Sequence, residues 1–283
     1  MNFLDPKTDI AFKKLFSNAQ HTDILINFLN STLSRSAGQQ IVSVAINDPY
    51  NHPEMITGKS SIVDVRCTDQ SGAQYIIEMQ VVNQKDFAQR CQYYVALALS
   101  RQLQKAEDFI KLTPVIFIGI LNYNIFQSTN YLSHHAIVNL ETGERTLTSQ
   151  EYHFVELKKF DKQLDQLDHD FDKWVYFFKN AENLQTVPTQ LKTHKAINEA
   201  FDILERSNWT LQDLAVYEKS LDLLRERFSQ IMTAREEGEL KGRLQGDFEA
   251  RYNVAKQLLD VLDVETIAQK TGLSIAEVEK LKS

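Results

Sequence analysis

One strand-like segment carries the residues best suited to chemistry. Residues 74–82 are apolar or aromatic except for Gln74, Glu78 and Gln80, the composition expected of a central strand. Because side chains alternate along a strand, Glu78 and Gln80 share one face. A buried carboxylate is costly unless it is paired or binds a metal. Glu78 is therefore the first candidate for a functional residue.

A second strand, at residues 61–68, supplies a partner for Glu78. The segment Asp69-Gln70-Ser71-Gly72 between the strands has hairpin chemistry. The turn predicts that residues whose numbers sum to 141 or 142 face each other, so Asp64 lies opposite Glu78 within one residue. Two facing carboxylates repel, and a divalent cation between them removes the conflict. A slip of one residue in the register would separate the pair.

This arrangement suits metal-dependent phosphodiester hydrolysis. Mg²⁺ typically takes one or two carboxylates and completes its shell with water and phosphate oxygens. Bound to Asp64 and Glu78, Mg²⁺ or Mn²⁺ supplies Lewis acidity and lowers the pKa of water. Gln80 has no basic group, so its predicted role is to orient the attacking water. The competing interpretation is a surface pair on an amphipathic hairpin, which the apolar flanks of Glu78 disfavour.

A long helix is predicted next, over residues 84–106. Arg90, Arg101 and Lys105 are separated by 11 and 4 residues, which places them on one helical face together with Tyr94. Basic residues with an aromatic, close to a metal site, suit contact with a DNA backbone. A solvated helix face with ion pairs is the alternative interpretation.

The pattern of apolar residues predicts an α/β domain over residues 1–160. Helices are expected at 1–35 and strands at 41–46, 114–121, 134–140 and 153–157. Helical patterns then dominate residues 161–232, including a helix at 211–231. Residues 233–283 are expected to form a charged helix at 234–262 and a hairpin resembling a helix-turn-helix.

Two features of this last region are specific. Gly238, Gly242 and Gly246 are four residues apart, which indicates either close helix contact or a pliable connector. In the hairpin, Gly272 suits a helix C-cap and Ser274 with Glu277 suits a capping box. The hairpin is either a DNA-binding unit, or a helical cap or dimer contact.

Bulk properties exclude several classes of protein. The net charge of −7 and the pI near 5.6 argue against a general polyanion-coating protein. Cys67 and Cys91 form no CxxC pair and are expected to be reduced, partly buried thiols. No targeting segment and no apolar run of about 20 residues is visible, so we expect a cytoplasmic protein without a membrane partner. The seven histidines form no HExxH motif, which disfavours a metabolic metalloenzyme.

The motifs together resemble those of the recombination-promoting nuclease/putative transposase family, within the PD-(D/E)XK superfamily. The resemblance covers nearly the whole chain and is most specific in residues 1–121. The residues that carry it are Asp5-Pro6-Lys7-Thr8-Asp9, Phe12-Lys13-Lys14-Leu15-Phe16, Asp64-Val65, Asp69, Gly72, Ile77-Glu78-Met79-Gln80, Arg90, Tyr93-Tyr94, Leu112 to Ile116, Ile118 to Leu121, Ala234 to Gly238 and Thr271 to Ser274.

The resemblance implies a restriction-endonuclease-like core, which is a mixed sheet flanked by helices. It also implies a divalent-metal-dependent DNA endonuclease linked to recombination, mobile elements or phage defence. A homodimer is a further expectation. The alternative is a catalytically weak or inactive DNA-binding or regulatory protein on the same fold.

Individual residues match the motif of the family. Asp64 takes the first acidic position, Glu78 the second, and Gln80 the lysine position. Val63 stands where the superfamily name has proline, and the family commonly shows Glu-x-Gln. Asp9 and Lys13 match the opening motif, and either support the metal and phosphate site or serve the fold.

Overall fold

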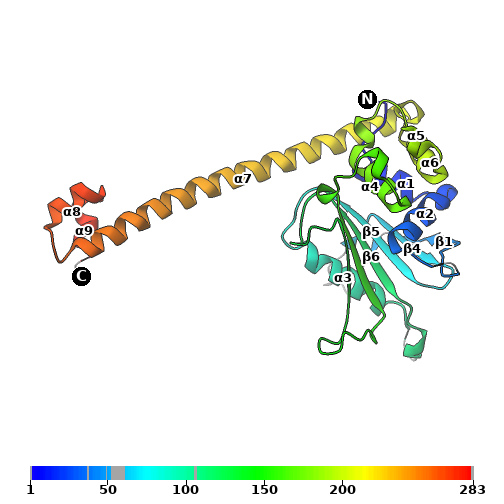
Figure 1. Ribbon diagram of the computed structural model, residues 1–283, viewed down its shortest axis with the longest axis horizontal. Coiled ribbons are helices and arrows are strands. Elements are labelled where there is room, and N and C mark those ends of the chain that lie inside the picture. Colours follow the sequence, from blue (N-terminus) through cyan, green and yellow to red (C-terminus); the bar gives the residue numbers. More distant parts are fainter. Residues whose placement is uncertain (1, 37, 49, 52–60, 105–106, 282–283) are drawn as a thin grey trace. The chain divides into compact units, whose positions relative to one another are not determined.

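The N-terminal part of the chain is built on a mixed six-stranded sheet with the strand order β1-β4-β5-β6-β8-β7 (Figure 1). The structure is a computed structural model that describes residues 2–36, 38–48, 50–51, 61–104 and 107–281. The strands are β1 Val44–Ile46, β2 Tyr50–Asn51, β3 Ser61–Ile62, β4 Val65–Asp69, β5 Gln74–Gln80, β6 Val115–Leu121, β7 Leu132–Ala136 and β8 Gln150–Glu156. β2 and β3 pair separately from the sheet.

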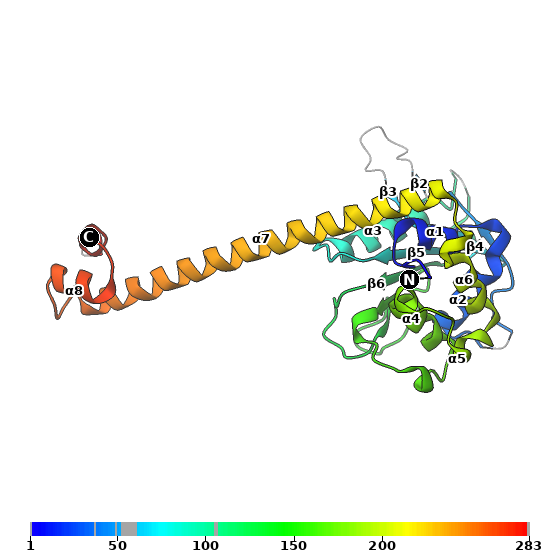
Figure 2. The same ribbon diagram turned by 90° about the horizontal axis from the view of Figure 1, so that it is seen from above.

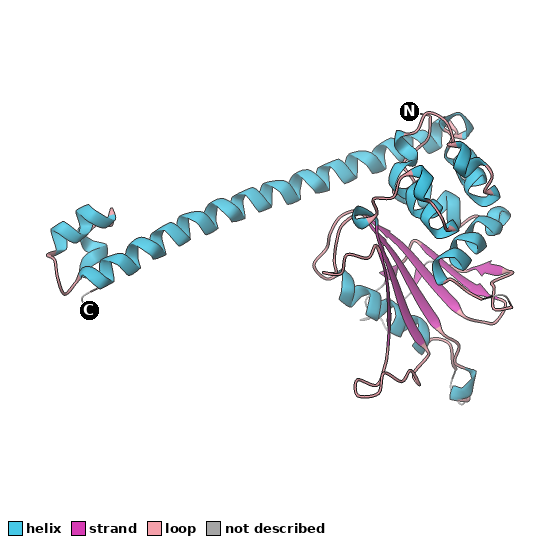
Figure 3. Cartoon of the chain, viewed as in Figure 1, coloured by secondary structure: helices cyan, strands magenta, loops and turns pink. Residues whose placement is uncertain are grey.

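Strand directions divide the sheet into two kinds of pairing. β1, β4 and β5 form an antiparallel run, β5, β6 and β8 are parallel, and β7 pairs antiparallel with β8. All seven residues of β6 are buried, as expected for a strand covered on both faces. The mixed sheet flanked by helices confirms the predicted fold class (Figure 3).

The β4–β5 hairpin has the register that the sequence predicted. Val65 pairs with Ile77, so paired residues sum to 142. In the turn, Asp69 Oδ1 accepts hydrogen bonds from the backbone N–H groups of Ser71 and Ala73. Gly72 has φ +85°, a conformation that side-chain-bearing residues rarely adopt. The turn therefore fixes which residues of the two strands meet.

Helices cover both faces of the sheet (Figure 2). Helices α1, α2, α4 and α6 pack through Phe16, Phe28, Trp174 and Phe178 on one side, and α3 packs through Phe87 on the other. The helices are α1 Asp9–Phe16, α2 Thr22–Leu33, α3 Phe87–Ser100, α4 Asp170–Asn180, α5 Thr189–Lys192, α6 Lys195–Leu204, α7 Leu211–Leu258, α8 Val264–Thr271 and α9 Ile275–Glu279. Short 3-10 turns lie at Ala19–His21, Phe109–Lys111, Leu157–Lys159, Leu164–Gln166, Ala181–Asn183 and Arg206–Asn208.

Helix α3 is shorter than the predicted helix over residues 84–106. It ends at Ser100, and Arg101 is its C-cap residue. Just beyond, the Gln102 side chain donates to the Thr113 carbonyl at 3.0 Å and accepts from the Thr113 N–H at 2.8 Å. These long-range bonds hold the chain where it leaves the helix, which local sequence does not reveal. Lys105 lies outside the described residues.

The chain divides into two compact units, Met1–Leu223 and Leu224–Ser283. In the first unit, the helices after residue 160 share one core with the N-terminal helices. α7 is continuous through Gly238, Gly242 and Gly246, although two separate helices were predicted. No helix of the described residues is long and apolar enough to cross a bilayer.

The second unit ends in the helical hairpin that the sequence predicted. Gly272 caps α8 with φ +71°. Ser274 and Glu277 form the expected capping box at the start of α9. A small core that includes Ile267, Leu273 and Val278 holds the hairpin together.

Candidate active site

Two carboxylates from adjacent strands meet near the C-terminal end of β5. The β4–β5 register places Asp64, directly before β4, beside Glu78 of β5. Asp64 Oδ2 accepts a hydrogen bond of 2.8 Å from the backbone N–H of Met79. The strand that carries Glu78 therefore also holds Asp64 in place.

Both carboxylates have pKa values above their usual range. Burial raises the pKa of Glu78 to about 8, the charge of Asp64 adds to this, and Arg90 opposes it. Burial likewise raises the pKa of Asp64 to about 6, against the hydrogen bond from Met79. Glu78 is 4% exposed. The chain thus holds one buried and one half-buried acid whose pKa values stay raised although Arg90 opposes the shift of both.

Gln80 is the last residue of β5 and lies on the same strand face as Glu78. Its Nε2 donates to the Val82 carbonyl at 3.0 Å, which fixes the orientation of the amide. The backbone carbonyl oxygen of Gln80 accepts a separate hydrogen bond of 3.0 Å from the backbone N–H of Asn122. An amide fixed in this way retains its side-chain oxygen as an acceptor.

The opening motif of the chain serves two different places. Asp9 and Lys13 form an ion pair of 2.7 Å on α1, and their charges act on Asp64, with Asp9 raising its pKa and Lys13 lowering it. Lys7, by contrast, is buried and lies 2.7 Å from Asp5 and 3.0 Å from Glu182. Asp9 and Lys13 therefore lie in reach of the carboxylate site, while Asp5 and Lys7 tie the N-terminus to the helical layer.

Arg90, one of the predicted DNA contacts, lies close to the carboxylates. Its Nη2 is 3.5 Å from Glu78 Oε2, its Nε donates to the Tyr94 hydroxyl at 3.3 Å, and Nη1 donates to Gln84. Tyr94 is 8% exposed, so it supports Arg90 and offers little surface to a ligand.

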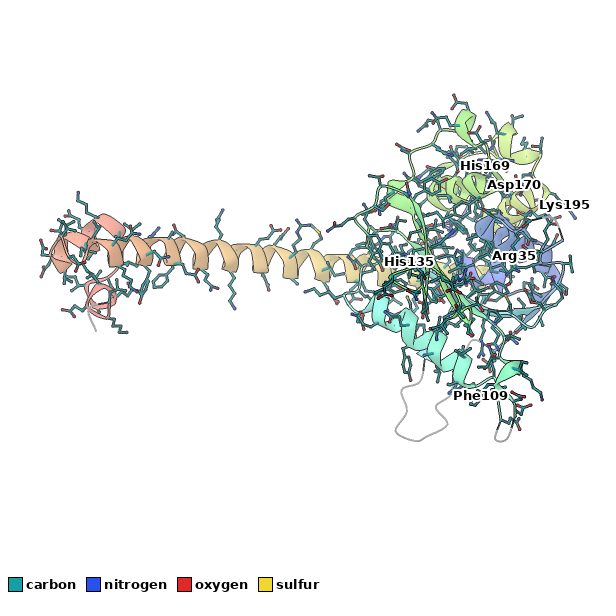
Figure 4. The ribbon with its side chains drawn as sticks, turned by 60° about the horizontal axis from the view of Figure 1, so that its bottom comes forward. Arg35, Phe109, His135, His169, Asp170 and Lys195 are labelled. Carbon is teal, nitrogen blue, oxygen red and sulfur yellow. The ribbon has the colours of Figure 1, made fainter. Side chains whose placement is uncertain are left out.

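Arg101 does not join this group. It follows Arg90 by 11 residues, a rise of about 16 Å along a helix, and its charge acts on Arg66 instead. Figure 4 labels the exposed Phe109, which lies on the turn shortly after this end of α3. Arg101 therefore lies about three helical turns beyond Arg90, at the end of α3.

One buried residue near Glu78, Tyr123, escaped the sequence analysis. Burial raises the pKa of both the Cys91 thiol and the Tyr123 hydroxyl, and the charge of Glu78 adds to this. Cys91 follows Arg90 on α3, and Tyr123 comes two residues after β6. The parallel β5–β6 pairing aligns Leu121 with Gln80 and so brings Tyr123, two residues later, near the end of β5. Cys67 and Cys91 are both buried free thiols, as predicted.

Three histidines, His134, His135 and His153, gather elsewhere, on β7 and β8. The rings of His134 and His153 are 4.4 Å apart, and His153 Nε2 contacts Glu151 at 3.2 Å. Arg35 and His135, both labelled in Figure 4, help to line a hollow of about 610 Å³ beside them. Within the described residues, no group of three or more His, Cys, Asp or Glu side chains could hold a metal.

The donor set at Asp64 and Glu78 fits a hard divalent cation. Two carboxylates are the number that Mg²⁺ typically takes from a protein, with waters and phosphate oxygens filling the remaining positions. The raised pKa values give the same indication, since burial is their main cause and a bound cation would stabilise the charged form of both carboxylates.

Comparison with known proteins gives one match. A family model described as PD-(D/E)XK nuclease family transposase matches residues 6–234 of the 283. The matched range includes α1, the whole sheet and the carboxylate pair. Comparison with curated proteins and with solved structures finds no match.

Proposed function

The chain belongs to the PD-(D/E)XK nuclease family transposases, and we propose that it is a divalent-metal-dependent DNA endonuclease with Asp64 and Glu78 as metal ligands. Its mixed six-stranded sheet flanked by helices is consistent with the restriction-endonuclease-like fold of that superfamily. The observation that carries the proposal is the pair of carboxylates that the β4–β5 register brings together, in which Glu78 is buried and the charge of Asp64 helps to raise its pKa.

The metal would be held by one oxygen from each carboxylate. Mg²⁺ or Mn²⁺ bound there supplies a Lewis acid for the scissile phosphate and lowers the pKa of a water. Asp64 is oriented for this role by the Met79 N–H at 2.8 Å. Glu78 is buried on β5, whose pairing with β4 and β6 fixes its backbone.

The remaining residues orient water and substrate. The side chain of Gln80 is anchored by its bond to the Val82 carbonyl. Its amide oxygen would accept a hydrogen bond from the attacking water and so orient the lone pair of the water oxygen toward the phosphorus. An amide takes up no proton at neutral pH, so the proton passes to solvent or to a substrate phosphate oxygen. Arg90 and Lys13 supply positive charge on either side of the carboxylates, which suits a phosphate backbone.

The proposed substrate is DNA, and the transposase description of the family suggests a role in recombination or mobile-element biology. The net charge of −7 does not oppose this. Electrostatic contact with a phosphate backbone depends on the local charge near the site, and only a few basic residues take part.

The test is nicking of supercoiled plasmid DNA by purified wild type, Asp64→Ala and Glu78→Ala in Mg²⁺ and in Mn²⁺. We expect each variant to lose at least about 10²–10³-fold in rate, because electrostatic stabilisation of the transition state is lost. Glu141→Ala removes an exposed carboxylate and should nick at the wild-type rate. Circular dichroism checks that the variants are folded, and full activity in either site variant would exclude the assignment.

A second candidate function rests on Gln80. Its amide stands where the motif of the superfamily has lysine, and it brings no ionisable group to the site. On this reading the chain is a DNA-binding regulatory protein on the same fold. DNA binding without cleavage in any divalent metal would favour it, and cleavage that disappears in Asp64→Ala would exclude it.

A further inference from the structure

Tyr123 lies at the same edge of the sheet as the carboxylate pair. β6 runs parallel to β5, with Gln80 aligned to Leu121. The backbone N–H of Asn122 then donates to the Gln80 carbonyl at 3.0 Å. The chain therefore leaves β6 directly beside the end of β5, and Tyr123 is the next residue.

The hydroxyl of Tyr123 is buried and has no hydrogen-bond partner among the described residues. The residue is 6% exposed. A buried tyrosine hydroxyl usually finds a partner, and an unsatisfied one destabilises the folded state. Phenylalanine would fill the same apolar space without that cost, so packing alone does not account for a tyrosine here.

The surroundings of the ring connect it to Glu78. The ring centroid is 6.5 Å from that of Phe87, the Arg90 guanidinium lies 5.6 Å from the Phe87 ring, and Arg90 is 3.5 Å from Glu78. The charges of Glu78 and Arg90 also act on Tyr123, though less than burial, which raises its pKa and keeps the hydroxyl protonated. Tyr123 is thus a neutral donor beside the end of β5, and the charge of Glu78 acts on it.

We propose that Tyr123 is a positioning residue whose hydroxyl donates a hydrogen bond to the Glu78 carboxylate when that carboxylate binds the metal. This inference rests on the proposed function. A carboxylate that gives one lone pair to a cation keeps others free, and donors to those lone pairs fix the orientation of a metal ligand. The unsatisfied hydroxyl is then a partner for the metal-bound state.

The experiment measures Mn²⁺ affinity by calorimetry in the full-length protein and in Tyr123→Phe. We expect about tenfold weaker binding in the variant, the lower end of the usual effect of removing such a partner. In EDTA, the Tm of the variant should be no lower than that of the wild type. It should rise by up to about 2–4 °C, because an unsatisfied buried group has been removed.

Tyr152→Phe is the matched control, since Tyr152 packs against the same core cluster but its hydroxyl contacts Gln150. Its Mn²⁺ affinity should equal that of the wild type. The pH profile separates positioning from a loss of structure. A donor to a carboxylate lowers its pKa, so Tyr123→Phe should move the half-maximal pH for Mn²⁺ binding upward.

Unchanged Mn²⁺ affinity in Tyr123→Phe overturns the inference while leaving the proposed function intact. Weaker binding together with a lower Tm and an unshifted pH profile also overturns it, because the role would then be structural. If the wild type itself fails to bind Mn²⁺, the proposed function fails first.

Discussion

Glu78 on β5 and Asp172 on α4 are equally buried acids with opposite electrostatics. Glu78 is 4% exposed and Asp172 is 0% exposed. Burial raises the pKa of Asp172 as well, but hydrogen bonds from Lys162 at 2.7 Å and Tyr131 at 2.5 Å outweigh it, so that the pKa falls below 3.8. The pKa of Glu78 rises instead to about 8, with Arg90 at 3.5 Å as its nearest cation.

The comparison separates a structural acid from one for which we propose a functional role. The chain supplies every partner that Asp172 needs, so its charge joins α4 to the loop before it. Glu78 faces a second acid and lacks an equivalent set of donors. Because strongly perturbed groups gather at functional sites, the uncompensated pair indicates that its partner comes from outside the chain.

The largest effect on folding is expected from Asp172→Asn. The substitution removes the charge and leaves Lys162 and Tyr131 with a weaker acceptor, so the free energy of unfolding should fall by about 2–3 kcal/mol. Urea denaturation measures it. Asp168→Asn, at an exposed position, should stay within about 0.5 kcal/mol of the wild type. An equally small change in Asp172→Asn would break the comparison.

Glu78→Gln is expected to raise the free energy of unfolding in EDTA, by less than Asp172→Asn lowers it. Folding raises the pKa of Glu78 from 4.5 to about 8, so the folded state holds a proton that the unfolded state lacks between these values. The free energy of unfolding therefore falls as the pH rises through this window. In Glu78→Gln the free energy of unfolding should fall less steeply with pH. At pH 8.5 it should exceed that of the wild type by about 1–2 kcal/mol, after the cost of burying the amide.

The pH profile of Asp172 runs the other way. Its pKa is lowered by folding, so its contribution is complete above the unfolded value of 3.8 and is lost as the pH falls below it. Urea titrations from pH 3 to pH 9 compare the two residues in one series. If the free energy of unfolding changed with pH in Glu78→Gln as it does in the wild type, this would contradict the raised pKa of Glu78.

The sequence predicted the parts of the site that depend on local rules. The turn at Asp69–Gly72 and strand alternation determine the register, so the meeting of Asp64 and Glu78 followed from spacing alone. Gly272 and the Ser274–Glu277 box were likewise readable from helix-capping chemistry.

Tertiary contacts decided the rest. The bonds between Gln102 and Thr113 fix the chain after α3, which ends at Ser100 and does not continue to residue 106. α7 runs through three glycines because the good helix formers around them offset a cost of about 1 kcal/mol each. Tyr123 follows a fully buried strand and reads as core in the sequence, and only the structure shows its unsatisfied hydroxyl.

The most direct test of the central claim is a calorimetric titration of Mn²⁺ into wild type, Glu78→Gln and Asp172→Asn at pH 8. The account predicts a saturable site in the wild type, the same site in folded Asp172→Asn, and at least about 100-fold weaker binding in Glu78→Gln, because a ligand carboxylate is lost. Equal Mn²⁺ affinity in the wild type and in Glu78→Gln would contradict it.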